Sequence, residues 1–423
     1  MPVEVVFLGT GTSSSVPHID CITAHAIPGS SQRPPCRTCL STIDGSIEGK
    51  KNIRRNTSIV VRLPGKAGSV TVLVDCGKNF QAAAVEWFPK YGLRRIDAVL
   101  ITHAHADAVN GLDDLRAWTL GKRIQPHIDL YVSKATFQDI KRMFPYLVSR
   151  EFATGGGDVC SAYNKYSRRS HQLQIPEFVW HVCIENALPF EIQDTSIMVT
   201  PFLVHHGRLF TTPTPLSAPP APSSVEKAET HIALNDVTPG IDIGQDPKQE
   251  VIIQPYMCFA FRQVQSFSCS RIILIQTTFR IQEDIVYLSD CGAIPDEAWP
   301  ALFPVSGRQL PVCILDCLNL RKPQHPSHFG LETAVAAARR IGAKRTYLLG
   351  FSHEVAHDEY VTIGEAIGGA AVAGRTNLTE NEVKGLEQIG EGDPIWVRPA
   401  HDGLKIQIST AEEEREVTDE TYS

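Results

Sequence analysis

Several features of membrane and nucleic-acid-binding proteins are missing from this sequence. Its 423 residues contain 40 Lys and Arg against 47 Asp and Glu, so no basic excess indicates binding to nucleic acid or anionic lipid. No run of about 18 apolar residues occurs, so we expect no membrane-spanning helix. The first residues include an acid and no basic leader, so we expect no signal peptide. These absences favour a cytoplasmic protein, with the nucleus as an alternative location.

A disulfide framework and internal repeats are missing as well. The 11 cysteines lack dense, regular spacing, and their odd number fits a reducing compartment better than secretion. A composition of 43% hydrophobic and 21% charged residues is that of an ordinary globular protein. The length allows one large α/β domain or two smaller domains.

Short β-branched runs separated by turns dominate the sequence, and helical patterns follow some of them. We predict strands at Val3–Leu8, Ser58–Leu63, Ser69–Val74, Ile96–Ile101, Ile197–Val204, Arg271–Thr278, Ile285–Ser289, Val312–Leu315 and Thr346–Leu349. We predict helices at Asn110–Leu120, Lys134–Leu147 and Phe329–Ile341. This mixture, without strict β–α alternation, predicts an α/β fold in which two sheets are sandwiched between helices.

Two segments are expected to lie outside this core. Residues 211–250 are rich in proline and then in polar and acidic residues, so we predict a flexible insertion. Residues 411–423 are predicted to form an acidic, frayed tail. The remaining core, within residues 1–410, is predicted to be a single domain.

A candidate metal site follows the predicted strand Ile96–Ile101. His103, His105 and Asp107 lie on one short loop, where all three side chains can turn toward one point. Neutral imidazole and carboxylate are ligands of zinc, iron and manganese. Three more candidate ligands come at or after the ends of other predicted strands: His206, Asp290 and His353.

The order and spacing of these residues resemble the metallo-β-lactamase superfamily. The run Phe7–Thr12 and the turn Asp75–Gly77 fit the same resemblance, which implies a four-layer αββα sandwich. Within the superfamily, Gly111–Arg116 and His325–Phe329 resemble the phosphoribosyl cyclic phosphate phosphodiesterases and their eukaryotic relatives. The transfer-RNA 3′-processing endonucleases are close cousins of that branch.

Carried over residue by residue, the resemblance implies a two-ion centre of Zn²⁺ or Mn²⁺. His103, His105 and His206 would bind the first ion, with His205 as the alternative to His206. Asp290 would bridge both ions, and Asp107 with His353 would hold the second. The family usually has histidine where this chain has Ala108, so the second ion is either weakly held or absent.

The resemblance further implies a phosphodiesterase that acts on a small cyclic or nucleotide-like phosphate. A metal-bound hydroxide would attack phosphorus, with Asp107 and Asp290 among the catalytic residues. His328 aligns with the proton-donating histidine of the family, and His325 is an alternative donor.

Three other functions remain open. They are a transfer-RNA 3′-processing endonuclease, a thioester or lactam hydrolase, and a degenerate relative that binds metal without turnover. The first would need an extended basic arm, whereas residues 211–250 are proline-rich and acid-leaning. The expected partners are a small phosphorylated substrate and, in a homodimer, a second copy of the chain. Neither a membrane nor nucleic acid is expected.

A second metal site is predicted near the N-terminus. Cys21, Cys36 and Cys39 have the spacing C-x14-C-x2-C, which suits structural zinc, an ion that takes four tetrahedral ligands. The phosphodiesterase relatives complete a comparable cluster with a histidine beyond the last catalytic ligand. We therefore predict His357 as the fourth ligand.

Overall fold

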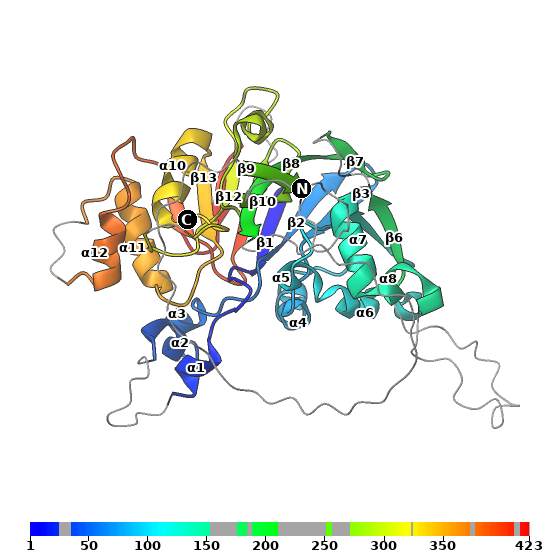
Figure 1. Cartoon of the computed structure of the whole chain (residues 1–423), viewed down its shortest axis with the longest axis horizontal. Helices are drawn as coiled ribbons and strands as arrows, with labels where there is room; N and C mark the ends of the chain where they lie inside the picture. The colour runs from blue at the N-terminus through cyan, green and yellow to red at the C-terminus, as the bar shows by residue number, and fades with distance from the viewer. Residues whose placement is uncertain are drawn as a thin grey trace, which may run out of the picture.

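Two mixed β-sheets pack face to face, and helices cover the outer face of each (Figure 1). The computed structural model describes residues 1–24, 35–152, 176–182, 184, 188–209, 251–255, 271–322, 325–372, 377–409 and 415–422. This arrangement confirms the predicted αββα sandwich. The predicted insertion, 211–250, lies outside the described residues.

The first sheet contains the N-terminal strands together with two strands from the end of the chain. Its order is β16-β15-β1-β2-β3-β4-β5-β6. The strands are β1 (Val3–Gly9), β2 (Ser58–Gly65), β3 (Gly68–Val74), β4 (Ala98–Leu100), β5 (Ile128–Val132), β6 (Phe178–Val182), β15 (Lys405–Ile408) and β16 (Val417–Asp419). Strands β3 to β6 are parallel to one another.

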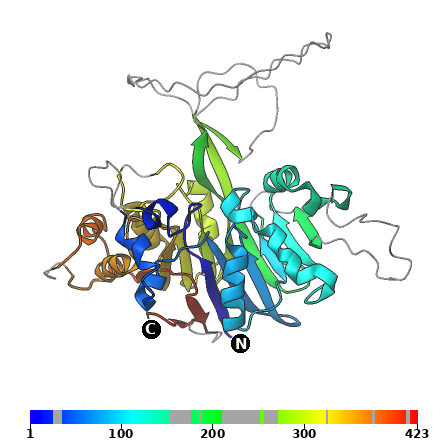
Figure 2. The same ribbon diagram turned by 90° about the horizontal axis from the view of Figure 1, so that it is seen from below.

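The second sheet has the order β14-β13-β12-β11-β10-β8-β7, and β9 also pairs with β10. The strands are β7 (Phe190–Ile192), β8 (Ile197–Leu209), β9 (Val251–Pro255), β10 (Arg271–Ile281), β11 (Ile285–Leu288), β12 (Val312–Asp316), β13 (Arg345–Leu349) and β14 (Val397–Pro399). Strands β11 to β14 are parallel. The C-terminal end of β8 and the N-terminal end of β10 extend together beyond the rest of the sandwich (Figure 2).

Alternating side chains explain why the layers form. In β1, Val5 and Phe7 point into the core between the sheets, whereas Val6 and Leu8 pack against helix α4 (Phe80–Lys90). Apolar residues on both faces of a strand require a cover on both sides. The other described α-helices are α1 (Ile19–Ile22), α2 (Arg37–Ser41), α3 (Ile47–Lys50), α5 (Ala106–Val109), α6 (Arg116–Thr119), α7 (Lys134–Met143), α8 (Pro145–Val148), α9 (Trp299–Leu302), α10 (Leu331–Ile341), α11 (His357–Ile367) and α12 (Glu380–Leu386).

Two of the predicted helices are broken. The segment 110–120 is a 3₁₀ turn, Leu112–Leu115, followed by the short helix α6. The segment 134–147 divides into α7 and α8, because Pro145 cannot donate the hydrogen bond that would continue the helix. The prediction for the third helix holds for α10, although the helix begins at Leu331 rather than Phe329.

The end of the chain is not frayed, so that prediction is wrong for residues 415–422. Val417–Asp419 is strand β16, in which Val417 and Asp419 are buried and Thr418 is exposed. Asp419 accepts hydrogen bonds from Arg345 (2.6 Å) and from the hydroxyl of Tyr347 (2.8 Å). A strand of three residues among acids leaves little apolar pattern, which explains why the sequence did not reveal it.

The helices of the described residues are all too short or too polar to cross a membrane.

Candidate metal centre

The predicted ligands come together at one end of the sandwich. The loop after β4 carries His103 and His105, β8 carries His206, and Asp290 follows β11. Strand β4 is parallel to β5, and β11 is parallel to β12. In sheets of this kind, the loops at the carboxyl ends of the parallel strands form the binding site. The sandwich thus brings together residues that are far apart in the sequence.

Three histidine side chains converge on one point. One ring nitrogen from each of His103, His105 and His206 lies within 4.8 Å of the others. His206 Nε2 is 3.1 Å from His105 Nδ1. Two nitrogens of a tetrahedral zinc ion, each ~2.05 Å from the metal, are separated by ~3.3 Å. The spacing therefore fits ligands of one ion, and His205 does not belong to this group.

Hydrogen bonds behind the rings fix which nitrogen faces the centre. Thr102 Oγ1 lies 2.8 Å from His103 Nδ1 and also bonds to the carboxylate of Asp75 at 2.9 and 3.0 Å. His206 Nδ1 is 2.8 Å from the carbonyl oxygen of Ser327. With Nδ1 protonated, each ring presents a bare Nε2 to the centre, which is the arrangement that metal ligands require.

The environment also keeps the imidazoles neutral. Burial, followed by the neighbouring His105 and His206, lowers the pKa of His103 well below its usual value. Burial and His206 lower the pKa of His105 to about 4. Only neutral imidazole binds a metal ion, so both side chains are ready to act as ligands at neutral pH.

Two carboxylates lie beside the histidines. Asp290 Oδ2 is 3.9 Å from His206 Nε2, and Asp107 Oδ1 is 4.0 Å from His103 Nε2. Burial and then Asp290 raise the pKa of Asp107. Asp107 Oδ1 and His103 Nε2 are buried without a hydrogen-bond partner among the described residues. Buried polar atoms need a partner, which a divalent cation and a water molecule bound to it would supply.

The metal loop is packed closely against the turn that follows β3. A Cβ atom at Gly77 would lie 1.9 Å from the carbonyl oxygen of Asp107, so only glycine fits there. Gly207, directly after His206, has a φ of 91°, which side-chain-bearing residues rarely adopt. Both glycines allow the backbone to present the ligands.

His328 stands next to these ligands and is supported from behind. Its Nδ1 is 2.9 Å from Oδ2 of Asp316, which is fully buried at the end of β12. Burial by itself lowers the pKa of His328, but Asp316 and Asp290 outweigh it and raise the pKa to about 9. His206, Asp290 and His328 form a second group whose ligand atoms lie within 4.8 Å of one another. His325, the alternative proton donor, is exposed.

The structure corrects the placement of His353. It does not lie with Asp107 and Asp290 but joins the cysteines, with Nδ1 3.5 Å from the sulfur atoms of Cys21, Cys36 and Cys39. Cys21 and Cys36 Sγ are 3.7 Å apart. Tetrahedral zinc with ~2.3 Å sulfur and ~2.05 Å nitrogen bonds predicts ~3.6 Å between sulfur and nitrogen and ~3.8 Å between sulfurs. These four residues therefore have the geometry of a Cys₃His zinc site.

His357 does not complete the cysteine cluster. It begins helix α11, and its Nε2 lies 2.9 Å from the hydroxyl oxygen of Tyr422. Its backbone N–H donates to Asn52 at 2.7 Å. Because His353 lies in the loop before the helix, it reaches the cysteines, whereas His357 points toward the end of the chain. Sequence spacing did not distinguish these two positions.

A family model matches the region that holds the three histidines. Residues 70–218 match the beta-lactamase superfamily domain. Together with the two-sheet sandwich, this match shows a metallo-β-lactamase fold. An octanoyltransferase of Porphyromonas gingivalis is 26% identical over 208 residues, which are 49% of this chain and 32% of that protein. The chain thus spans about a third of that relative's length.

Solved structures with this fold cover nearly the whole chain. A diphosphatase of the PhnP family is 21% identical, with a TM-score of 0.54 and coverage of 96% of both chains. Zn²⁺-bound PqqB from Methylobacterium extorquens is 16% identical, with a TM-score of 0.50 and coverage of 95% of this chain and 99% of that one. At such identities the similarity shows the metallo-β-lactamase fold.

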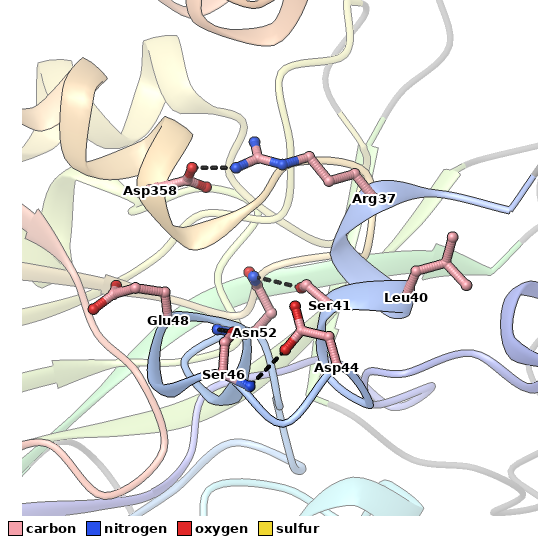
Figure 3. A pocket seen from close by; sticks show the side chains of 9 residues that line it. Arg37, Leu40, Ser41, Asp44, Ser46, Glu48, Asn52 and Asp358 are labelled. Atoms are coloured by element: carbon pink, nitrogen blue, oxygen red, sulfur yellow. Dashed lines mark hydrogen bonds and ion pairs between the residues drawn. The ribbon is translucent and has the colours of Figure 1, made fainter.

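A separate pocket lies away from the metal centre. It has a volume of about 510 Å³ and is lined by residues of the α2–α3 region and by Asp358 of α11 (Figure 3). An ion pair between Arg37 and Asp358 reaches across it. Its lining includes no predicted metal ligand, and we assign the chemistry to the histidine cluster instead.

Several supporting residues of the metallo-β-lactamase site were not predicted. Asp316 follows the predicted strand Val312–Leu315, so its position at a strand end was a usable signal. Ser13, whose hydroxyl donates to Asp107 Oδ2, offered none, because serine is common in turns. Asp75 was noted only as part of a turn, and its bond to Thr102 depends on the fold.

The cysteine cluster makes a prediction about metal content. Replacing Cys36 by Ser should remove one zinc ion per chain, since a tetrahedral site loses a thiolate. The melting temperature should fall by several degrees, because bound metal stabilises the folded state. Elemental analysis and calorimetry would measure both effects. Replacing His357 by Ala is the matched control and should leave the zinc content unchanged; loss of zinc there would restore His357 as the ligand.

Proposed function

We propose that this protein is a metal-dependent phosphodiesterase that acts on a small cyclic or nucleotide-like phosphate. The observation that carries the proposal is the His328–Asp316 pair, which lies beside the histidine cluster. A histidine whose pKa is raised to about 9 is protonated at neutral pH and can donate that proton.

The need for a proton separates the candidate reactions. Cleavage of a phosphodiester releases an alkoxide, which is a poor leaving group unless it is protonated. A thioester releases a thiolate with a pKa of about 8.5, which can leave without a proton. A buried carboxylate devoted to holding a protonated histidine therefore favours the phosphodiester over the thioester.

Each residue has a distinct task in this proposal. His103, His105 and His206 would hold a divalent ion, which would supply Lewis-acid activation of water and offset the charge of the phosphate. Asp316 holds Nδ1 of His328, so the transferable proton is at Nε2. Asp290 has a carboxylate oxygen within 4.8 Å of ring nitrogens of His206 and His328, and its negative charge raises the pKa of His328.

Zn²⁺ and Mn²⁺ are the proposed cofactors. Three imidazoles suit zinc, and the neighbouring carboxylates also admit manganese. The similar fold of PqqB was solved with Zn²⁺ bound, which supports zinc as the first metal to test.

A turnover assay tests the proposal. We expect zinc- or manganese-loaded protein to hydrolyse bis(p-nitrophenyl) phosphate and ribose cyclic phosphates faster than an acyl thioester of similar size. His103→Ala, tested in parallel, should reduce hydrolysis to background. Equal rates for the two proteins would point to contamination or another site, and a preference for the thioester would contradict the phosphodiester assignment.

A further inference from the structure

We infer that the histidine centre holds a single divalent ion and that Asp107 acts as a carboxylate that positions the attacking water. The role of the water rests on the proposed function, whereas the number of ions does not. The family resemblance implied a two-ion centre, and a single ion differs from that expectation.

Two groups of possible metal ligands share one nitrogen atom. His206 belongs both to the group with His103 and His105 and to the group with Asp290 and His328. Its Nδ1 bonds to the carbonyl oxygen of Ser327, so Nε2 is the donor available to either group. One imidazole nitrogen has one lone pair and binds one ion. The two groups therefore compete for the same ion.

Two of the positions that would hold another ion cannot do so in this chain. Ala108 is buried, with 2% of its surface exposed, and its methyl group cannot act as a ligand. His353, the other predicted ligand, lies with the three cysteine thiols. Of the predicted ligands of the second ion, Asp107 and Asp290 remain near the centre. Among the described residues, the histidine that groups with Asp290 besides His206 is His328, and that group still needs the one available nitrogen of His206.

The carboxylate of Asp107 is held by a hydrogen bond on one oxygen, and its other oxygen faces the histidines. Its Oδ2 accepts a hydrogen bond from Ser13, whose carbonyl oxygen accepts one from Lys78. Its Oδ1 lies 4.0 Å from His103 Nε2, but among the described residues Asp107 belongs to none of the groups of donors whose atoms all lie within 4.8 Å of one another. A carboxylate fixed by a hydroxyl and set back from the donors suits a hydrogen bond to water.

Counting ions in matched variants tests the inference. We expect wild-type protein, loaded with zinc and dialysed, to hold two ions per chain, one in the histidine centre and one in the cysteine cluster. His206→Ala should lose the first, Cys36→Ser the second, and Asp107→Asn neither. Asp107→Asn should still reduce turnover by ~10²-fold or more, because misplacement of a reacting group costs about that much.

Manganese provides a readout independent of zinc content and activity. Mn²⁺-loaded Cys36→Ser protein should give the six-line paramagnetic resonance spectrum of an isolated ion, and wild-type protein serves if that variant fails to fold. Three zinc ions per wild-type chain, loss of an ion in Asp107→Asn, or a spectrum of two coupled manganese ions would each overturn the inference. Failure to hydrolyse any diester, with the ion counts as expected, would refute only the proposed function.

Discussion

Replacing His206 by Ala should abolish turnover and remove the ion of the histidine centre. His206 Nε2 is common to both donor groups, so no group of three histidine or carboxylate donors remains there among the described residues. Metal ions contribute several kcal/mol to such reactions, and each 1.36 kcal/mol is tenfold, so we expect a loss of at least ~10³-fold in kcat. Kinetics and elemental analysis of the same sample would measure both effects.

His205 supplies the matched control for this variant. It precedes His206 on the same strand and belongs to neither group of possible metal ligands. His205→Ala should keep the ion and keep turnover within a few-fold of wild type. If His205→Ala lost the ion and His206→Ala retained it, the assignment of the ligand would be reversed.

The second large effect concerns proton donation. With a ribose cyclic phosphate, whose alkoxide leaving group needs a proton, His328→Ala should lower kcat by about 10²–10⁴-fold without loss of metal, which is the range for removal of a general acid. His325→Ala is the control, because this exposed neighbour has a ring centroid 5.4 Å from that of His328. A small effect of His328→Ala together with a large effect of His325→Ala would transfer the role of donor to His325.

The pH dependence should distinguish positioning by Asp316 from a purely structural role. A general acid works while protonated, so activity should fall as pH rises through the pKa of His328. That pKa is raised to about 9, and a bound cation, which adds positive charge nearby, would place the fall at or below this value.

Asp316→Asn removes a buried negative charge next to His328. The pKa of His328 should fall, and the alkaline limb of the kcat profile should move to lower pH by about 1–3 units. Metal content should be unchanged, and activity should be retained best at low pH. An unshifted limb with a uniformly lower rate would show that Asp316 only supports the structure.

The layered fold could be predicted because its strands are apolar on both faces. Val3–Gly9 and Ser58–Gly65 are buried almost throughout, and a strand with that pattern must lie between two layers. Helix boundaries were less predictable, since Pro145 divides one helix and local 3₁₀ geometry replaces another. Strand β16 was missed because its acids are held by tertiary partners.

The candidate site was partly predictable for a similar reason. His103, His105, His206 and Asp290 lie on strands or directly after them, so strand order places them at one edge. His353 and His357 lie in and after a loop, where sequence spacing does not determine direction. The support given by Asp316 to His328 and by Ser13 to Asp107 depends on contacts between distant segments.

Crystals of zinc-loaded protein, measured at the zinc absorption edge, would test most directly whether distant segments share an ion. We expect one anomalous peak among His103, His105 and His206, and a second among Cys21, Cys36, Cys39 and His353. A peak at the cysteines alone, with none between the three histidines at saturating zinc, would contradict the assignment of a metal-dependent hydrolase.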